Sequence, residues 1–500
     1  MKRRLTIALT LSLLLALGIY GAVLAQGGSP IDLNSLPGGG WWVSWQVQNV
    51  GTQTANLQVQ ALGADGTTFG SGTASATIDP GAGLTFIPGN LNPLSPELEP
   101  GFIGSAVLSA DQPIVAIGFV QNNQVFDLGV PGGLAGAAYQ GVSGDDAGST
   151  VAFPLVKLDW AGQSTTLYIQ AAGAPASVSV TYRMNDGTEV TDGPYDLDAD
   201  EMKVFTPSDK LGSPACGSDA ASTPCLGGAV ATSTTGDIVG IFTEHPTVAD
   251  PAPFVLSTKG FGPNDAGTTL AAPIIKNDWV GRTTGLTVQN ASTSQVTVNV
   301  TFTGAPPAAC AGNTYAGTEV TLDPGKSYVY FPTLGNMGGF PSNCFGSATI
   351  TGTGPIVATV NESGANKKTV YSAFATANAT KKVAVPLVKE DWVNRTTGVA
   401  LQNVGESSTN VTCTYNVVQS QGTNPGSVTL TSQTIPAGGA IALYRVWTNP
   451  GQYGADAAKL EKSFSAVICE SDSENIVAIA QEADLSGQFD IKNYEGFNIQ

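Results

Sequence analysis

The chain is poor in charge and in histidine, and these two shortages exclude most catalytic chemistry. Charged residues make up only 12% of the chain, about half the usual share. The single histidine, His245, confines any Ser-His-Asp or Cys-His site to its surroundings. It lies just after an expected strand and before Pro246, so we interpret it as a loop-edge residue. No G-x-S-x-G or H-E-x-x-H motif occurs. The sequence therefore predicts a protein that is not an enzyme and has no cofactor.

Metal-binding patterns are also scarce. Cysteines with C-x-x-C spacing are absent. The alternate acids Asp196, Asp198 and Asp200 are spaced like calcium ligands, although the loop lacks the glycine of an EF-hand. A looser calcium site is one interpretation of these residues. The other is an ordinary turn, because Asp198 aligns with Asp79 and Asp323 in the repeats described next.

What the chain does contain is a repeat. One motif, Pro-hydrophobic-hydrophobic-Lys-x-Asp-Trp, occurs three times. Its copies carry Pro154, Lys157, Asp159 and Trp160, then Pro273, Lys276, Asp278 and Trp279, then Pro386, Lys389, Asp391 and Trp392. A glutamine follows each Trp by ten residues, and a divergent N-terminal copy keeps only this second half. The four anchor glutamines, Gln48, Gln170, Gln289 and Gln402, are 122, 119 and 113 residues apart. This spacing predicts a tandem array of four units.

Each unit reads as a set of short strands. Apolar residues alternate with Thr, Ser or Asn, as at Val178, Val180 and Tyr182, and Gly, Pro and Asp separate the runs. Period-two alternation with such turns predicts antiparallel sandwiches with one buried face per sheet. We therefore expect an all-β chain with four sandwich domains. Their expected bounds are 26–144 for the divergent first unit, then 145–264, 265–380 and 381–500.

Together these elements resemble a known architecture. A Pro-Leu-Val-Lys strand, a strand that opens with Thr and ends Gln-Asn-x-Gly, a Leu-x-Pro-Gly turn and a Gly-Ser-Ala strand are similar to the tandem immunoglobulin-like sandwiches of bacterial secreted and cell-surface proteins. The resemblance implies an elongated, non-enzymatic extracellular protein used for structure, display or adhesion. The chain departs from antibody-type domains because no Trp follows Cys413 by about a dozen residues.

The N-terminus predicts export. Three basic residues precede an apolar run that ends with small residues at Val23 and Ala25, the pattern of a secretory signal over residues 1–25. An uncleaved membrane anchor is the alternative. Cleavage leaves 18 basic against 39 acidic side chains, a net charge of −21. Such a charge argues against nucleic acid and anionic membranes as partners.

The cysteines agree with export. None falls in the first unit and two fall in each of the others, which predicts three disulfides within units. The expected pairs are Cys216 with Cys225, Cys310 with Cys344, and Cys413 with Cys469.

The tryptophans leave two interpretations open. In the repeated motif they could stack on sugar rings, with repetition supplying avidity. Alternatively they cap the sandwiches or pack at the junctions between units, with the motif lysines paired to nearby acids. In the first unit Trp42 is the candidate for an exposed ligand contact, since Trp41 and Trp45 share the opposite strand face.

The sequence thus predicts an exported rod, secreted or at the cell surface, with a structural or adhesive role. Its expected partners are surface or matrix components, glycans or further copies of itself. Residues 29–33 of one chain could complete the last sheet of another, or could simply be a degenerate first strand. The alternative function is an array of carbohydrate-binding modules that uses exposed tryptophans.

Overall fold

The computed structural model describes residues 41–86, 103–122, 136–217, 219–220, 222–246, 255–364, 367–485 and 491–499. Antiparallel strands dominate these residues, and the helices are single turns such as α2 (Ser208–Leu211) and α3 (Pro450–Tyr453). The all-β prediction is confirmed. The expected signal segment and residues 29–33 lie outside the described residues.

Unit two shows the architecture most completely. Its two sheets have the strand orders β11-β10-β13-β8 and β12-β9-β14-β15. The strands are β8 (Thr150–Lys157), β9 (Gln163–Ala171), β10 (Ala176–Met184), β11 (Glu189–Leu197), β12 (Met202–Phe205), β13 (Leu226–Ser233), β14 (Ile238–Pro246) and β15 (Leu256–Lys259). In β10 every second residue is buried, so the sequence alternation places Val178, Val180 and Tyr182 between the sheets.

Unit four repeats this arrangement in the orders β28-β27-β31-β25-β34 and β30-β26-β32-β33. Its strands are β25 (Lys382–Glu390), β26 (Arg395–Asn403), β27 (Thr409–Ser420), β28 (Ser427–Thr429), β29 (Gln433–Ile435), β30 (Ala440–Leu443), β31 (Ser463–Ser471), β32 (Ile476–Asp484), β33 (Ile491–Glu495) and β34 (Phe497–Ile499). The free side of β25 is paired with the unit's own β34.

Unit three has the same plan, but one long strand, β22, pairs in both sheets. Its strands are β16 (Gly267–Asn277), β17 (Arg282–Asn290), β18 (Val296–Gly304), β19 (Thr314–Ala316), β20 (Val320–Leu322), β21 (Ser327–Tyr330), β22 (Cys344–Gly364), β23 (Lys367–Ser372) and β24 (Phe374–Ala375).

Unit one is the divergent copy. Its sheets have the orders β4-β1-β6-β7 and β3-β2-β5. They contain β1 (Trp41–Asn49), β2 (Ala55–Gly63), β3 (Thr68–Ile78), β4 (Gly83–Phe86), β5 (Gly104–Ala110), β6 (Ile114–Asn122) and β7 (Gly136–Gln140). Within the ranges described for this unit, no strand occupies the place that β8 takes in unit two.

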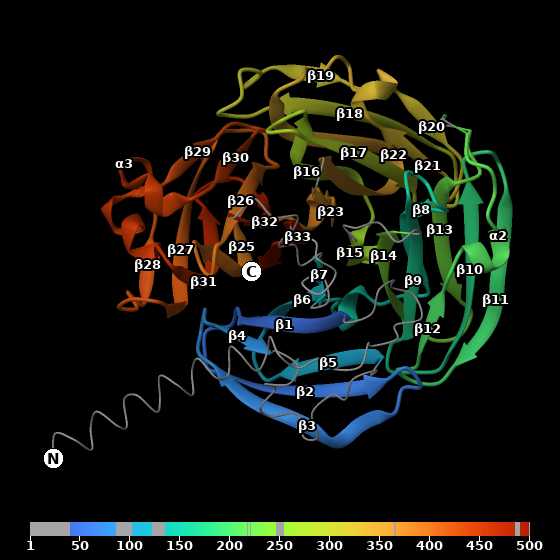
Figure 1. Ribbon diagram of the computed structural model, residues 1–500, viewed down its shortest axis with the longest axis horizontal. Coiled ribbons are helices and arrows are strands. Elements are labelled where there is room, and N and C mark those ends of the chain that lie inside the picture. The colour runs from blue at the N-terminus through green and yellow to red at the C-terminus, as the bar shows by residue number, and fades with distance from the viewer. Residues whose placement is uncertain are drawn as a thin grey trace, which may run out of the picture.

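The four units form a closed ring (Figure 1). Their last strands, β7, β15, β23 and β33, contact one another in circular order around the centre. A head-to-tail contact that is repeated with a constant rotation closes into a ring when the rotation divides a full turn. Here it closes at four units, so the elongated rod implied by the resemblance is wrong for this chain.

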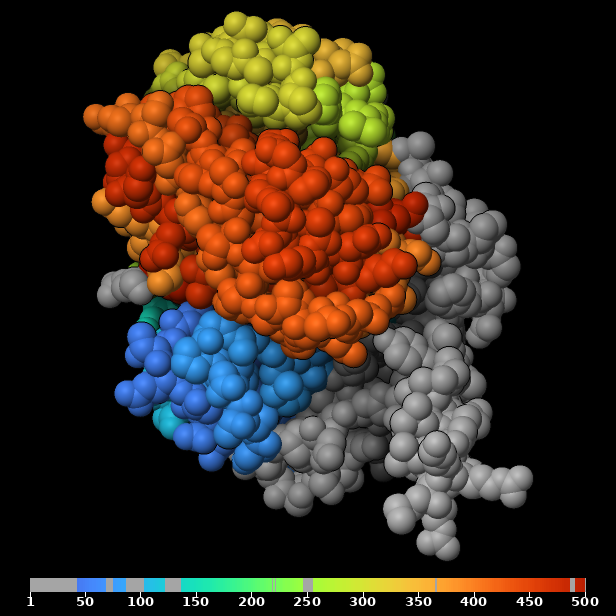
Figure 2. Space-filling model, turned by 90° about the vertical axis from the view of Figure 1, so that its left-hand side faces the viewer, coloured from blue at the N-terminus to red at the C-terminus, as the bar shows by residue number. Residues whose placement is uncertain are grey.

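Closure depends on an apolar contact between the first and last units. Ile117, Phe119 and Ala138 of unit one belong to the hydrophobic core of unit four. The Phe119 ring meets the ring of the fully buried Tyr494 edge to face, with centroids 5.6 Å apart. Figure 2 shows unit four, in orange, packed against unit one in blue and unit three in yellow.

The anchor glutamines that reveal the repeat hold the junctions. Each donates a hydrogen bond from Nε2 to a turn carbonyl of its own unit. The acceptors are, in chain order, Gly81, Asp200, Gly325 and Gly438. Three also reach the preceding unit, at Ser105 Oγ, Ala229 O and Ala348 O over 2.8, 3.2 and 3.4 Å. The periodic glutamine therefore has a structural cause.

The sulfurs of the three expected cysteine pairs are bonded, each pair within one unit. The pairs stand at different places in the fold. Cys413 and Cys469 face each other across neighbouring strands of one sheet. Cys216 and Cys225 close a short loop, nine residues apart in sequence. The disulfides are thus separate reinforcements of one repeated fold.

Candidate functional site

The lysine of the repeated motif forms an ion pair with a buried glutamate of its own unit. Lys157 pairs with Glu244, Lys276 with Glu362 over 2.9 Å, and Lys389 with Glu482 over 2.8 Å. These carboxylates are at most 1% exposed. The glutamates occupy equivalent places in the repeat. Each lies six residues after an isoleucine, which begins β14 (Ile238) and β32 (Ile476) and lies within β22 (Ile356).

In two of the three ion pairs, those of Glu244 and Glu362, the carboxylate also accepts a hydrogen bond from an amide side chain of the next unit around the ring. Asn361 Nδ2 of unit three donates to Glu244 Oε1 over 2.7 Å. Gln481 of unit four donates to Glu362 over 2.9 Å, and its oxygen accepts from Lys276 over 2.9 Å. We call these sets of residues the junction clamps. They join two units through a desolvated, charge-assisted network.

The third pair faces unit one, where the amide is replaced by a ring. Phe119 stands five residues after Ile114, as Asn361 and Gln481 do after their isoleucines. The Lys389 ammonium lies 5.9 Å from the centre of the Phe119 ring. The ring-closing junction therefore uses aromatic packing in place of the amide.

Two of the three buried glutamates, Glu362 and Glu482, stay ionised at neutral pH. Burial alone raises the pKa of the Glu482 carboxyl, but Lys389, Arg395 and Lys492 outweigh it and lower the pKa to about 2. Burial likewise opposes ionisation of Glu362, whose pKa is nevertheless lowered by Lys276 and Arg282. Both carboxyls contribute to folding while they are ionised.

The motif tryptophans are half-buried and pack within their own units. Trp279 lies 6.3 Å from Phe345, and Trp392 meets Phe464 edge to face at 5.2 Å between ring centres. Trp160 packs against the core of unit two. Of the two interpretations left open by the sequence, capping of the sandwich describes these contacts.

After each Trp the chain makes the same tight turn. The next two residues have positive φ, and the amide that follows donates back to the Trp carbonyl. Two units place a valine at the first of these positions, Val280 at 74% and Val393 at 51% exposure. A β-branched residue at positive φ is strained, so these turns are imposed by the surrounding fold.

The acidic residues with calcium-like spacing lie in a turn of unit two. Asp200 caps a turn by accepting from the Gly173 amide over 2.9 Å, and the Asp198 amide donates to Glu201. Across the described ranges, no three acidic, histidine or cysteine side chains are grouped to hold a metal ion. These hydrogen bonds are those of an ordinary turn, and calcium binding by Asp196, Asp198 and Asp200 stays a prediction.

His245 and Trp42 complete the set. His245 Nε2 lies 3.0 Å from Thr166 Oγ1 in the ladder between β9 and β14. Trp42 pairs with Gln121 in the ladder between β1 and β6, and its side chain lies outside the described residues. The prediction of an exposed ligand contact at Trp42 stays a prediction.

The sequence pattern missed a surface cluster in unit four. Tyr444, Arg445 and Trp447 directly follow β30, at the start of the connection to β31. Tyr444 is 48% exposed, and the Arg445 guanidinium lies 5.3 Å from the centre of the Trp447 ring. The comparison of repeats passes over this cluster because the connection differs in every unit. A search for aromatic residues next to arginine outside the repeat would have found it.

Beneath this region the core of unit four holds a buried acid. Glu390 is fully buried, in contrast to most acidic residues of the chain. Burial raises its pKa well above the ordinary value, and a hydrogen bond from the Val446 backbone and the positive charge of Arg445 offset only part of this effect. Unit two carries Leu158 at the same place, so the acid is a feature of unit four.

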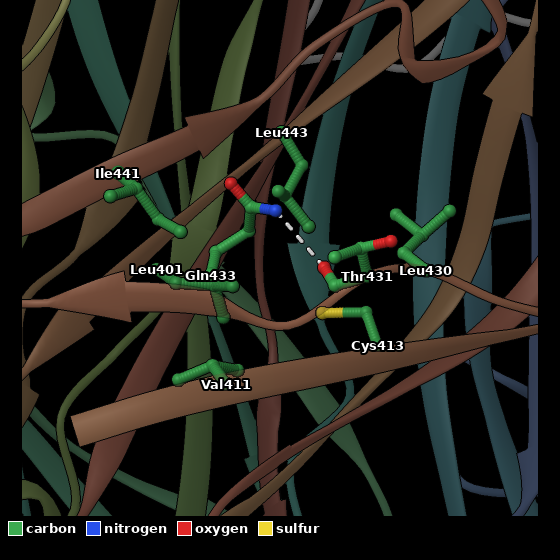
Figure 3. Close-up of a pocket in the computed structure, with 8 residues that line it drawn as sticks. All are labelled: Leu401, Val411, Cys413, Leu430, Thr431, Gln433, Ile441 and Leu443. Atoms are coloured by element: carbon green, nitrogen blue, oxygen red, sulfur yellow. Dashed lines mark hydrogen bonds between the residues drawn. The ribbon is translucent and has the colours of Figure 1, made fainter. Parts of the chain in front are cut away.

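Unit four also has a shallow apolar pocket between its sheets (Figure 3). Its rim includes the hydrogen bond from Gln433 Nε2 to the Thr431 carbonyl, 3.0 Å long. The lining residues are Leu401, Val411, Cys413, Leu430, Thr431, Gln433, Ile441 and Leu443. Its polar groups are hydrogen-bonded locally, and Cys413 is held in a disulfide. In the part of the chain described, no helix is long and apolar enough to cross a membrane.

Comparison with known proteins gives no family. No family model and no curated protein matches the chain. Among solved structures, Thermotoga maritima 1070 is 18% identical, with a TM-score of 0.18, covering 22% of this chain and 96% of its own. A calcium-stabilised adhesin with which an Antarctic bacterium binds ice is 12% identical, with a TM-score of 0.11, covering 91% and 93%. A tetra-tandem repeat from the extending region of a large adhesion protein is 12% identical, with a TM-score of 0.10 and the same coverage. None of these likenesses is close enough to carry an argument.

Proposed function

We propose that the protein is a non-enzymatic extracellular scaffold with a structural or adhesive role. The supporting observation is that the repeated polar residues are used to hold the ring. Two junction clamps and three of the anchor glutamines bridge neighbouring units, and the motif tryptophans cap their own sandwiches.

A rigid ring of this kind presents its variable connections at fixed positions. The units differ most in the connection between β12 and β13 of unit two, which corresponds to β21–β22 in unit three and β30–β31 in unit four, and each stabilises it differently. Unit two uses the Cys216 to Cys225 bridge, unit three bonds Cys344, and unit four packs Tyr453 and Leu460 into its core. Variable connections on a constant framework are where proteins place recognition.

The proposal requires that the protein be exposed outside the cell, and this can be measured. Intact cells of the source organism are treated with a protease that cannot enter them, and the protein is followed with an antibody. We expect loss of the antibody signal together with a mature chain that lacks residues 1–25. A signal that is protected until the cells are lysed would contradict the proposal.

Self-assembly and glycan binding are two forms that the proposed role can take. Light scattering after size-exclusion chromatography of the native protein separates large regular assemblies from a monomer. The carbohydrate alternative is favoured by one cluster, Tyr444, Arg445 and Trp447, in place of the motif tryptophans.

A further inference from the structure

The cluster that follows β30 has the features of a built contact surface. The Tyr444 ring lies over the backbone of Gly398 in β26, where an added Cβ would stand 3.3 Å from the ring. Unit three repeats this arrangement with Phe331 over Gly285. The glycine thus leaves room for an aromatic ring against the strand, and 48% of Tyr444 remains exposed.

Arg445, the next residue, has a strained backbone conformation. Its φ is +49°, a left-handed conformation that side chains other than glycine, asparagine and aspartate rarely adopt. Its carbonyl accepts from Thr448 Oγ1 over 2.9 Å, and its guanidinium rests near Trp447. A glycine would relieve the strain, so a strained arginine at an exposed position suggests a use for its guanidinium.

Residues of both unit three and unit four hold the strands beneath the Tyr444 cluster in place. Gly398 faces Gln481 in the ladder between β26 and β32, so their side-chain positions share one face of the sheet. Gln481 is fixed by Arg282 of unit three over 2.8 Å and by the clamp around Glu362. The buried Tyr453 of α3, which follows the cluster in sequence, packs into the core of unit four and anchors this connection. The surface is therefore rigid before any ligand arrives.

We propose that Tyr444, Arg445 and Trp447 form a binding site for a neutral polysaccharide chain. A hexose or N-acetylhexosamine ring stacks its C–H face on the exposed Tyr444 ring, and the guanidinium of Arg445 donates hydrogen bonds to ring hydroxyls. Trp447 orients the guanidinium and extends the apolar surface. A neutral chain is favoured because the protein has a net charge of −18, which repels polyanions.

This site would give the proposed adhesive role a ligand, and it rests on the proposed function only in assuming that the protein meets that ligand outside the cell. Binding in solution is independent of where the protein is found. The protease experiment on cells and the binding experiment can therefore fail separately.

Calorimetric titration of the mature protein tests the site, with hexamers of β-1,4-linked glucose, β-1,3-linked glucose and β-1,4-linked N-acetylglucosamine as probes. We expect at least one probe to bind, accompanied by a change in tryptophan fluorescence. Tyr444→Ala and Trp447→Ala should each weaken binding about tenfold or more. Leu334→Ala, which truncates a side chain of 43% exposure in the equivalent connection of unit three, is the matched control and should bind normally.

Arg445→Gly separates recognition from folding. Because glycine tolerates the positive φ, this variant should be at least as stable as the wild type toward urea and should bind the same probe about tenfold more weakly. Two results would overturn the proposal: no binding of any of the three probes at millimolar concentration, or unchanged affinity in both the Tyr444 and the Trp447 variants.

Discussion

Glu482 is the residue whose replacement tests the junction chemistry most sharply. It is 1% exposed and lies against Lys389 at 2.8 Å, Arg395 at 3.0 Å and Lys492 at 4.0 Å. Glu482→Gln keeps the shape and leaves buried cations without their counter-charge. Removal of one partner from a buried ion pair costs about 3–5 kcal/mol.

The pKa of Glu482 gives a second, independent magnitude. In the fold it is about 2, against 4.5 for an unperturbed glutamate, a difference worth about 3 kcal/mol. Because the folded pKa is depressed, this contribution is fully present above pH 4.5 and is lost as the pH falls toward 2. The variant should lose it at every pH, so the two proteins should approach each other in stability at low pH.

Urea unfolding at pH 7 and pH 3, followed by tryptophan fluorescence, measures both effects. Glu470→Gln is the matched control, since Glu470 is 62% exposed and pairs with Lys382 at the surface. Its loss should change the free energy of unfolding by less than about 0.5 kcal/mol. If Glu482→Gln unfolds at the wild-type urea concentration at pH 7, the buried ion pair of Lys389 and Glu482 does not stabilise the fold and the reasoning is refuted.

Three further variants probe other parts of the fold. Glu390→Leu, which copies Leu158 of unit two, should stabilise the protein at pH 7 by about 1–3 kcal/mol because it removes a buried carboxyl whose ionisation the core opposes. Its folded pKa is raised, so the gain in thermal stability should disappear below about pH 4.5, the ordinary pKa of a glutamate, and a gain that persists in acid would contradict this cause. Phe119→Ala should cost about 3–5 kcal/mol and speed amide hydrogen exchange in β33, whereas unchanged exchange there would show that the ring closes without this side chain. Replacement of both Cys413 and Cys469 by alanine should lower stability by about 4 kcal/mol for a sequence separation of 56, and an unchanged urea midpoint would contradict it.

The sequence was sufficient to predict the features that recur in each unit, namely the strands and their buried faces. Alternation such as Val178, Val180 and Tyr182 sets which strand face is buried, and this local rule holds whatever the units do next. The cysteine pairs followed from their even distribution among units.

The relation between units was beyond the sequence alone. A tandem array gives a rod or a ring depending on the rotation between neighbours, and that angle depends on contacts far apart in the chain. Gln481 meets Lys276, and Phe119 meets Tyr494, across sequence separations that periodicity does not encode. The Tyr444 cluster was missed for the opposite reason, because Arg445 and Trp447 lie in a connection whose residues differ from unit to unit.

Small-angle X-ray scattering of the mature protein tests the central claim most directly. A closed ring with a filled centre should give a radius of gyration near the compact value for this length, about 23 Å. Four sandwiches in a rod would give roughly twice that value or more, with a scattering profile typical of an elongated particle. A compact monomer supports the closed ring, and an elongated monomer would contradict it.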